Sequence, residues 1–191
     1  MNRLLILLII IIISHSAHAG DNIQNGDMES SANWIATSPH SFAERRTDIV
    51  GHGGSSGSFI LTITDADLNG FPDGTDGEIR ATKTFQTLCD VDYTLTGWFY
   101  AHTFKSKSGE DAEILIILYR GNEISDRHPS AIGRILEKDV VFNDWTKIQI
   151  GPFKDNYCGA TATVGLFMNV GKVEEWESIP VIYWDDISVI P

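Results

Sequence analysis

Runs of residues that favour β-strands follow one another along most of this chain, and this pattern limits the fold more than any other feature. The runs alternate polar and apolar residues or are continuously β-rich, and Gly, Asp, Asn and Pro separate them. They are Ser58–Thr64, Glu78–Gln86, Asp92–His102, Glu113–Tyr119, Val140–Phe142, Trp145–Ile150, Ala160–Asn169 and Val181–Ile190. No segment has the caps and period of a long helix, although Ala131–Lys138 is compatible with a helical turn interrupted by Gly133. Many strands without crossover helices predict an all-β fold, an antiparallel sandwich or barrel.

The N-terminus has the layout of a secretory signal peptide over residues 1–19. Arg3 makes its start positive, residues 4–13 are an unbroken apolar run, and Ala17-His18-Ala19 is a small-x-small cleavage site. The alternative is a membrane anchor, but such a run rises only about 15 Å as a helix, roughly half of a bilayer core. We expect a secreted protein, extracellular or periplasmic, in which residues 20–191 form a single domain with no membrane insertion after cleavage.

The charge balance excludes two classes of partner. The chain has 14 Lys and Arg against 26 Asp and Glu, which gives a formal net charge of −12. Such an acidic chain repels phosphate backbones and anionic lipid surfaces. We therefore expect neither a nucleic acid nor an anionic membrane surface as its partner.

The chain has 2 cysteines, Cys89 and Cys158. In an oxidising compartment a disulfide between them is the expected state, and two buried free thiols are the alternative. Their spacing matches no zinc-binding pattern. Each cysteine lies just before an expected strand, Asp92–His102 or Ala160–Asn169, so both are expected at strand-entry turns.

The expected strand at Asp92–His102 has two chemically different faces. The apolar face predicts core residues, namely Tyr93, Leu95, Gly97, Phe99 and Ala101. The opposite face combines hydroxyls with large rings: Thr94, Thr96, Trp98, Tyr100 and His102. Flat rings can stack on sugars while neighbouring polar groups bond sugar hydroxyls. The interpretation is a sugar-binding surface formed by Trp98, Tyr100, Thr96 and His102; the alternative is that a loop or a second layer covers these rings.

The segment from residue 65 to residue 76 has the donor spacing of a calcium loop. Calcium prefers about six to eight hard oxygen ligands in a flexible cage. Gly70 permits the sharp turn that such a cage needs. The segment resembles the helix-free calcium loops of thrombospondin type 3 repeats; the alternative is a polar turn, because turns are rich in Asp and Gly. The expected ligands are the side chains of Asp65, Asp67, Asn69, Asp73 and Asp76 and the backbone oxygen of Phe71.

Catalytic motifs are not supported by this sequence. Residues 53–57 have the G-x-S-x-G spacing of a nucleophile elbow, but that elbow needs a helix after it and Ser58–Thr64 is an expected strand. A glycosidase would need a pair of carboxylates, and sequence spacing cannot select one pair among 26 acids. We therefore expect the chain not to be an enzyme.

Five segments resemble, in order, the carbohydrate-binding modules of families 4, 9 and 22. Residues 25–29, NGDME, followed by Trp34, are similar to the opening "NGxFE…W", and residues 53–63 to "hSGxysLxv". Residues 93–98, YTLTGW, are similar to the strand "YtlsfW", and Trp145 with Ile148 to "Wxxv". Residues 182–189, IYWDDISV, are similar to the final strand "yxDDvsv".

This resemblance implies a galactose-binding-like β-sandwich jelly roll of two antiparallel sheets. It also implies a structural calcium ion that ties the opening segment to the last strand. By position, Glu29 and Asp185 would be its side-chain ligands, with Asp185 preferred over Asp186. Backbone oxygens near Gly26 and Ser56 would complete the site. The loop at residues 65–76 is an insertion relative to this pattern and would be a second, separate site.

The expected function is that of a secreted, calcium-stabilised, non-catalytic module that binds a polysaccharide or a cell-surface glycan. A structural or adhesive extracellular surface protein on the same jelly roll is the alternative, and a polysaccharide-cleaving enzyme is the third class. An exposed aromatic strip on one sheet separates the first class from the second.

Calcium binding by the 65–76 loop predicts that calcium raises the melting temperature. A ligand that binds only the folded state stabilises it by RT ln(1 + [L]/Kd), about 2.7 kcal/mol at a hundredfold excess over Kd. We expect the protein to melt at a higher temperature in calcium than in EDTA. Asp67→Ala should remove the contribution of the loop without unfolding the chain. Equal midpoints in the two buffers would contradict calcium binding.

Overall fold

The computed structural model describes residues 23, 26–29, 34–36, 41–63, 78–87, 90–105, 112–121, 129–154, 161–169 and 179–191. Within these ranges the chain is almost entirely strands and turns. The strands are β1 (Ile35–Ala36), β2 (Ser41–Arg46), β3 (Ser58–Ile63), β4 (Glu78–Gln86), β5 (Asp92–Thr103), β6 (Glu113–Arg120), β7 (Pro129–Leu136), β8 (Trp145–Lys154), β9 (Thr161–Asn169) and β10 (Val181–Ile190). Two single 3-10 turns, η1 (His52–Gly54) and η3 (Glu137–Asp139), lie between them.

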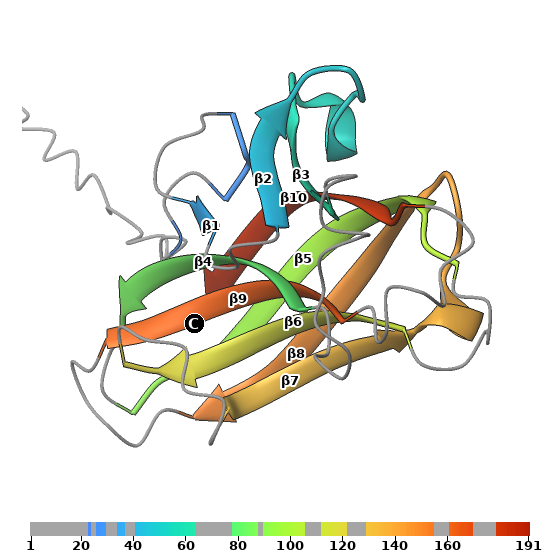
Figure 1. The fold of residues 1–191 in the computed structure, drawn as a ribbon. Helices are drawn as coiled ribbons and strands as arrows, with labels where there is room; N and C mark the ends of the chain where they lie inside the picture. The colour runs from blue at the N-terminus through green and yellow to red at the C-terminus, as the bar shows by residue number, and fades with distance from the viewer. Residues whose placement is uncertain are drawn as a thin grey trace, which may run out of the picture.

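The strands form two antiparallel sheets packed face to face, as Figure 1 shows. One sheet has the order β1-β4-β9-β6-β7 and the other the order β2-β3-β10-β5-β8. Most neighbours within a sheet are far apart along the chain, and β10 lies between β3 and β5. This topology is that of a β-sandwich jelly roll, so the predicted fold class is confirmed.

The core lies between the sheets and follows the alternation of their strands. In β5 the predicted inward residues Leu95 and Phe99 have no exposed surface. Phe99 contacts Trp184 of β10 with ring centroids 5.7 Å apart. From the facing sheet, Ile116 of β6 and Leu166 of β9 complete this core with no exposed surface of their own. The two inward faces therefore bury each other, which is what holds the sandwich together.

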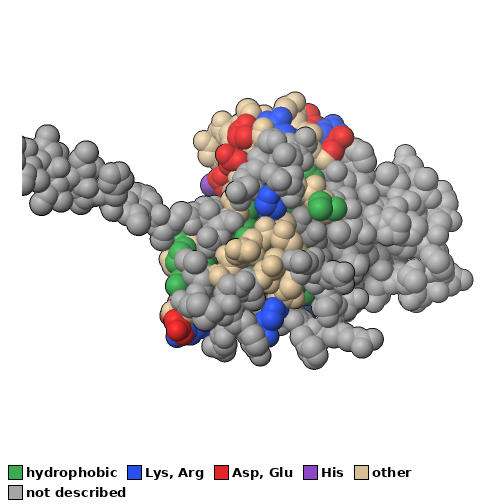
Figure 2. All heavy atoms as spheres, turned by 90° about the vertical axis from the view of Figure 1, so that its left-hand side faces the viewer, with side chains coloured by type: hydrophobic (Ala, Val, Ile, Leu, Met, Phe, Trp, Pro, Cys, Tyr) green, Lys and Arg blue, Asp and Glu red, His purple; other side chains and the backbone are tan. Residues whose placement is uncertain are grey.

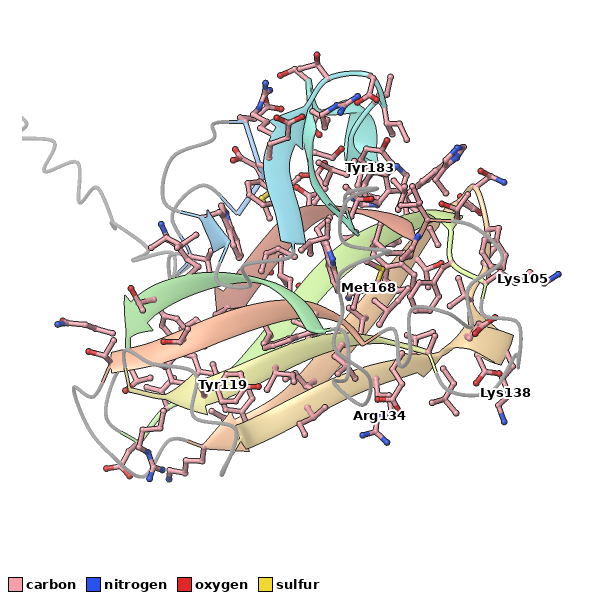
Figure 3. The ribbon with its side chains drawn as sticks, in the orientation of Figure 1. Lys105, Tyr119, Arg134, Lys138, Met168 and Tyr183 are labelled. Atoms are coloured by element: carbon pink, nitrogen blue, oxygen red, sulfur yellow. The ribbon has the colours of Figure 1, made fainter. Side chains whose placement is uncertain are left out.

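A second apolar cluster lies on the opposite face of the β1-β4-β9-β6-β7 sheet. Ile116 points into the core, so its neighbours on β6 point the other way. These are Leu115, Ile117 and Tyr119, and Phe167 of β9 joins them. The rings of Tyr119, labelled in Figure 3, and Phe167 lie 6.0 Å apart. Because β6 is buried on both faces, its sequence is a nearly continuous apolar run.

The segment Ala131–Lys138, which is compatible with an interrupted helical turn, belongs for the most part to β7. β7 pairs with β6 from Pro129 to Leu136, and its side chains alternate between the two faces of the sheet. Gly133, which interrupts a helical pattern, is required by packing here. A Cβ at this position would lie 2.9 Å from Ile116 Cγ2. Arg134, on the opposite face, points away from the sandwich in Figure 3.

The other strand predictions differ in detail. Val140–Phe142 is not a strand, because Phe142 makes only a single bridge to Ala101. β1 and β2 were not predicted, although β2 pairs with β3 over six residues.

Three predicted features lie outside the described residues. They are the signal segment of residues 1–19, the 65–76 loop and the cysteines Cys89 and Cys158. In the described part of the chain, the structure contains no helix of the length and hydropathy needed to span a bilayer.

The core predicts a large difference between two phenylalanine substitutions. Phe99→Ala should lower the free energy of unfolding by about 3–5 kcal/mol, because it leaves a cavity between the sheets. Phe142 is 42% exposed, so Phe142→Ala should change that free energy by no more than about 0.5 kcal/mol. Urea denaturation followed by circular dichroism measures both, and similar losses would contradict this placement of the core.

Candidate functional site

Three aromatic side chains lie side by side across the outer face of the second sheet. Tyr100 of β5 is in register with Tyr183 of β10 on one side and Trp145 of β8 on the other. Their ring centroids lie 6.2 Å (Tyr100–Tyr183) and 5.7 Å (Tyr100–Trp145) apart. Tyr100 and Trp145 are half-buried and Tyr183 is buried. We call these three residues the aromatic row; they point away from the core because Phe99 and Trp184, next to them in sequence, point into it.

Trp98 extends this surface along β5, and a histidine lies on its ring. The imidazole of His52, from η1, stacks on the indole at 3.7 Å between centroids and 15° between planes. His52 also contacts Trp145 edge to face at 6.0 Å. Trp98 is half-buried as a result. The alternation predicted its outward direction, and the packing of the 52–54 turn decides how much of the ring is open.

Polar groups border the row at the end where β7 and β8 are joined. Asn143 has a left-handed backbone with φ of 57°, a conformation that asparagine tolerates. Its Oδ1 accepts a hydrogen bond of 3.4 Å from Tyr100 Oη and lies 3.3 Å from Nδ1 of His102. His102 is exposed, whereas the hydroxyl of Thr96 is already bonded to Ser188 at 2.7 Å. Of the two predicted polar residues, His102 is therefore the one open to a ligand.

A β-bulge in β10 places two consecutive aspartates on this same side of the sheet. The register with β5 shifts between Asp185 and Ser188, and Asp186 has a left-handed φ of 47°. The carboxylate of Asp186 lies 2.7 Å from Nδ1 of His52 and so holds the imidazole over Trp98. Regular alternation would have placed Asp186 in the core.

The neighbouring carboxyl of Asp185 is completely buried. Its Oδ2 accepts a hydrogen bond of 2.6 Å from Ser55 Oγ, and its Oδ1 accepts one of 2.8 Å from the backbone N–H of Asp186. Burial raises the pKa of Asp185 to about 6, although the Ser55 hydrogen bond acts in the opposite direction. Burial also raises the pKa of Tyr183, with a further contribution from the charge of Asp48.

The residues expected to bind a calcium ion near the termini lie in one region, but each has another partner. The carbonyl oxygen of Gly26 accepts a hydrogen bond of 2.8 Å from the N–H of Ile187. Glu29 accepts hydrogen bonds from the N–H of Ser56, at 2.7 Å, and from the Ser56 hydroxyl, and it pairs with Arg45 Nη2 at 3.2 Å. These Ser56 hydrogen bonds and then the Arg45 charge lower the pKa of Glu29.

The Arg45 guanidinium therefore already pairs with Glu29, one of the two expected side-chain ligands, and the other, Asp185, is bonded to Ser55. Within the ranges that the structure describes, no three His, Cys, Asp or Glu side chains form a group suited to a metal. A calcium ion requires several converging oxygens, and in this arrangement the Glu29 and Asp185 carboxylates are each directed to another partner, Arg45 and Ser55 respectively. The other expected ion site, the 65–76 loop, lies outside the described residues.

Sequence reasoning missed several residues of this surface. Trp145 is identifiable only by pairing β8 with β5, because its register with Tyr100 is what brings the two rings together. Nothing local predicts that His52, 46 residues before Trp98 in the sequence, stacks on it. Asn143 likewise depends on the path of the loop between β7 and β8.

Comparison with models of protein families finds no match, and comparison with curated proteins finds none. Solved structures align over most of the chain. A structure of carbohydrate-binding modules with promiscuous specificity, from the β-sandwich superfamily, matches 91% of the chain at a TM-score of 0.57 and 15% identity. The chain has the fold of β-sandwich carbohydrate-binding modules. It spans 63% of the length of that first structure.

Two further carbohydrate-binding modules match over nearly their whole length. The CBM22-2 xylan-binding domain of Paenibacillus barcinonensis Xyn10C covers 86% of this chain, and 94% of that domain is aligned, at a TM-score of 0.52 and 12% identity. A family 4 module covers 88% of this chain and is aligned over 99% of its own length, at a TM-score of 0.50 and 18% identity. The similarity is therefore one of fold.

The buried carboxyl of Asp185 predicts an unusual pH dependence of stability in EDTA. Unfolding returns the pKa of Asp185 to its ordinary value of 3.8, below the folded value of about 6. As the pH rises from about 4 to about 6, the unfolded chain loses this proton first, so stability falls by at most about 3 kcal/mol and then levels. The Asp185→Asn variant has no carboxyl to titrate at this position, so it lacks this loss of stability. The Tm of the variant should therefore decline less than the Tm of the wild type between pH 4 and pH 7. Parallel Tm profiles for the two proteins would contradict this account.

Proposed function

We propose that the chain is a non-catalytic carbohydrate-binding module whose ligand contacts the half-buried rings of Tyr100 and Trp145 and the part of the Trp98 indole that His52 leaves open. The observation that carries the proposal is the outward-facing group of Tyr100, Trp145 and Trp98 on a sheet of a carbohydrate-binding-module fold. Aromatic faces on a rigid sheet supply apolar area at little cost in conformational entropy, because strand pairing already fixes the side chains.

Polar side chains beside these rings suit a ligand rich in hydroxyls. His102 and Asn143 border Tyr100 at one end. Lys147, the register partner of Trp98, and Gln149, the register partner of Thr96, are exposed on β8. A surface with aromatic faces in the middle and hydrogen-bonding groups at the edges suits a sugar chain, which presents apolar ring faces and polar rims.

The cellular setting belongs to the same proposal. A signal peptide at residues 1–19 would deliver the module outside the cytoplasm, where polysaccharides and cell-surface glycans occur. Calcium would bind the inserted 65–76 loop, whose donors match those of known calcium loops. The strongly acidic charge of −12 favours a neutral or basic glycan over an acidic one.

A structural or adhesive role is the alternative, and the exposed apolar side chains are the observation that bears on it. The exposed large apolar side chains include Ile35, Val50, Ile132 and the neighbouring pair Val141 and Phe142. Scattered exposed residues are normal on a monomer, whereas a continuous patch would indicate a protein interface. The binding experiment below therefore decides between the two functions.

Removing the indole of Trp98 should weaken glycan binding more than it lowers the stability of the fold. Trp98→Ala should reduce affinity by roughly thirtyfold, since the loss of a central aromatic anchor commonly costs about 2 kcal/mol. Trp145→Ala should weaken binding in the same way. Affinity electrophoresis on a panel of soluble polysaccharides, including xylan and mannan, identifies the ligand, and isothermal titration then measures each variant.

The matched control is Ile132→Ala, which removes an exposed side chain from the other sheet. It should leave affinity unchanged. If wild-type protein binds no polysaccharide while Trp98→Ala lowers Tm, Trp98 is a packing residue and the structural role is favoured. If Ile132→Ala weakens binding as much as Trp98→Ala does, the ligand does not bind at the aromatic row.

A further inference from the structure

Charged side chains gather at the end of the molecule formed by β2 and the turn after it, as Figure 2 shows. Arg46 on β2 pairs there with Asp48 at 2.8 Å and with Glu44 at 3.3 Å. These three side chains are each more than a third exposed, so their pairing contributes little to stability. The neighbouring Arg45 is different: only 20% of its side chain is exposed.

Arg45 points to the other side of β2 and joins three segments of the chain. Its Nε donates a hydrogen bond of 2.8 Å to the carbonyl oxygen of Met28. Its Nη2 donates one of 2.9 Å to Ser56 Oγ and one of 3.2 Å to Glu29. Glu29 in turn accepts the N–H of Ser56. The guanidinium therefore links β2, the 26–29 segment and the loop before β3.

The 26–29 segment needs such an attachment because it closes the core without being a strand. Met28 has no exposed surface, and its backbone has a left-handed φ of 54° that an apolar side chain rarely adopts. At its other end the segment contacts β10, where a Cβ on Gly26 would lie 1.8 Å from the carbonyl oxygen of Ile187. The Arg45 contacts thus hold a short irregular segment at the edge of the core.

The resemblance to carbohydrate-binding modules assigns a structural calcium ion to the 26–29 segment, the Ser56 loop and, through Asp185, the last strand β10. A calcium ion ligated by Glu29 and the Ser56 loop would lie within a few ångströms of the guanidinium, and the two positive charges would repel. A planar guanidinium instead meets a carboxylate, a hydroxyl and a carbonyl oxygen with directed N–H donors. Arg45 thus balances the charge of Glu29, and the other expected side-chain ligand, Asp185, accepts hydrogen bonds from Ser55 Oγ and the N–H of Asp186 instead.

We propose that the Arg45 guanidinium is the built-in cation of this site and that it attaches the 26–29 segment to β2 and to the Ser56 loop without calcium. Stability at this end of the sandwich is then independent of the calcium concentration. Any calcium response of the protein arises elsewhere, and the 65–76 loop is the expected place.

The calcium test compares two variants of the full chain. The first lacks three loop ligands (Asp65→Ala, Asp67→Ala and Asp73→Ala), and the second carries Glu29→Gln in addition. Tm is measured in 2 mM calcium and in EDTA. If Arg45 is the cation, the shift in Tm caused by calcium is the same whether or not Glu29 is present. A calcium-dependent shift that Glu29→Gln abolishes would overturn the proposal. This result does not depend on any glycan, so it is separate from the proposed function.

The second test compares two neighbouring arginines on the same strand in EDTA. Arg45→Gln should lower Tm by about 5 °C or more, because the Glu29 carboxylate and the Met28 carbonyl lose their donors. Arg46→Gln, the matched control, should lower it by about 2 °C or less. The double variant Arg45→Gln/Glu29→Gln should lose less Tm than the sum of the losses in the two single variants, because Arg45 and Glu29 stabilise the fold through the same contact. Equal losses for the two arginines, or full additivity with Glu29, would overturn the proposal.

Discussion

β10 lies in the middle of its sheet, hydrogen-bonded to β3 on one side and to β5 on the other, and most of the structure depends on this position. Its inward side chains Trp184, Ile187 and Val189 are all part of the core. The sheet is complete only when β10 has inserted between β3 and β5, which precede it by more than 75 residues in the sequence. Pairing between strands so far apart in the sequence is typical of slowly folding β proteins.

The bulge in β10 connects this packing to the outer surface. Because one extra residue is accommodated opposite Gly97, Asp185 and Asp186 both face outward while Ile187 still reaches the core. One aspartate is buried beneath the loop before β3, and the other holds His52 over Trp98. The shape of the aromatic surface is therefore linked to the strand that completes the sheet.

The parts of the fold that follow from local pattern could be predicted. In β5 the alternation correctly separates the core residues from the outward ones, because a strand buried on one face shows its period directly. β7 was not predicted, because the reason for Gly133, its close packing against Ile116, exists only in the assembled sheet. β2 was missed because its charged residues, including Arg45 and Arg46, look like a solvated turn before their partners are known.

The sequence by itself determined that the chain folds into antiparallel strands, which residues of β5 face the core, and that large rings lie on the opposite face. Those properties depend on the two-residue period of a strand, which is local. Only the tertiary structure decided that Trp145 stands beside Tyr100, that His52 stacks on Trp98, and that Arg45 pairs with Glu29, an expected ion ligand. These contacts join residues that are distant in the sequence, so their geometry exists only after the strands have paired and the two sheets have packed together.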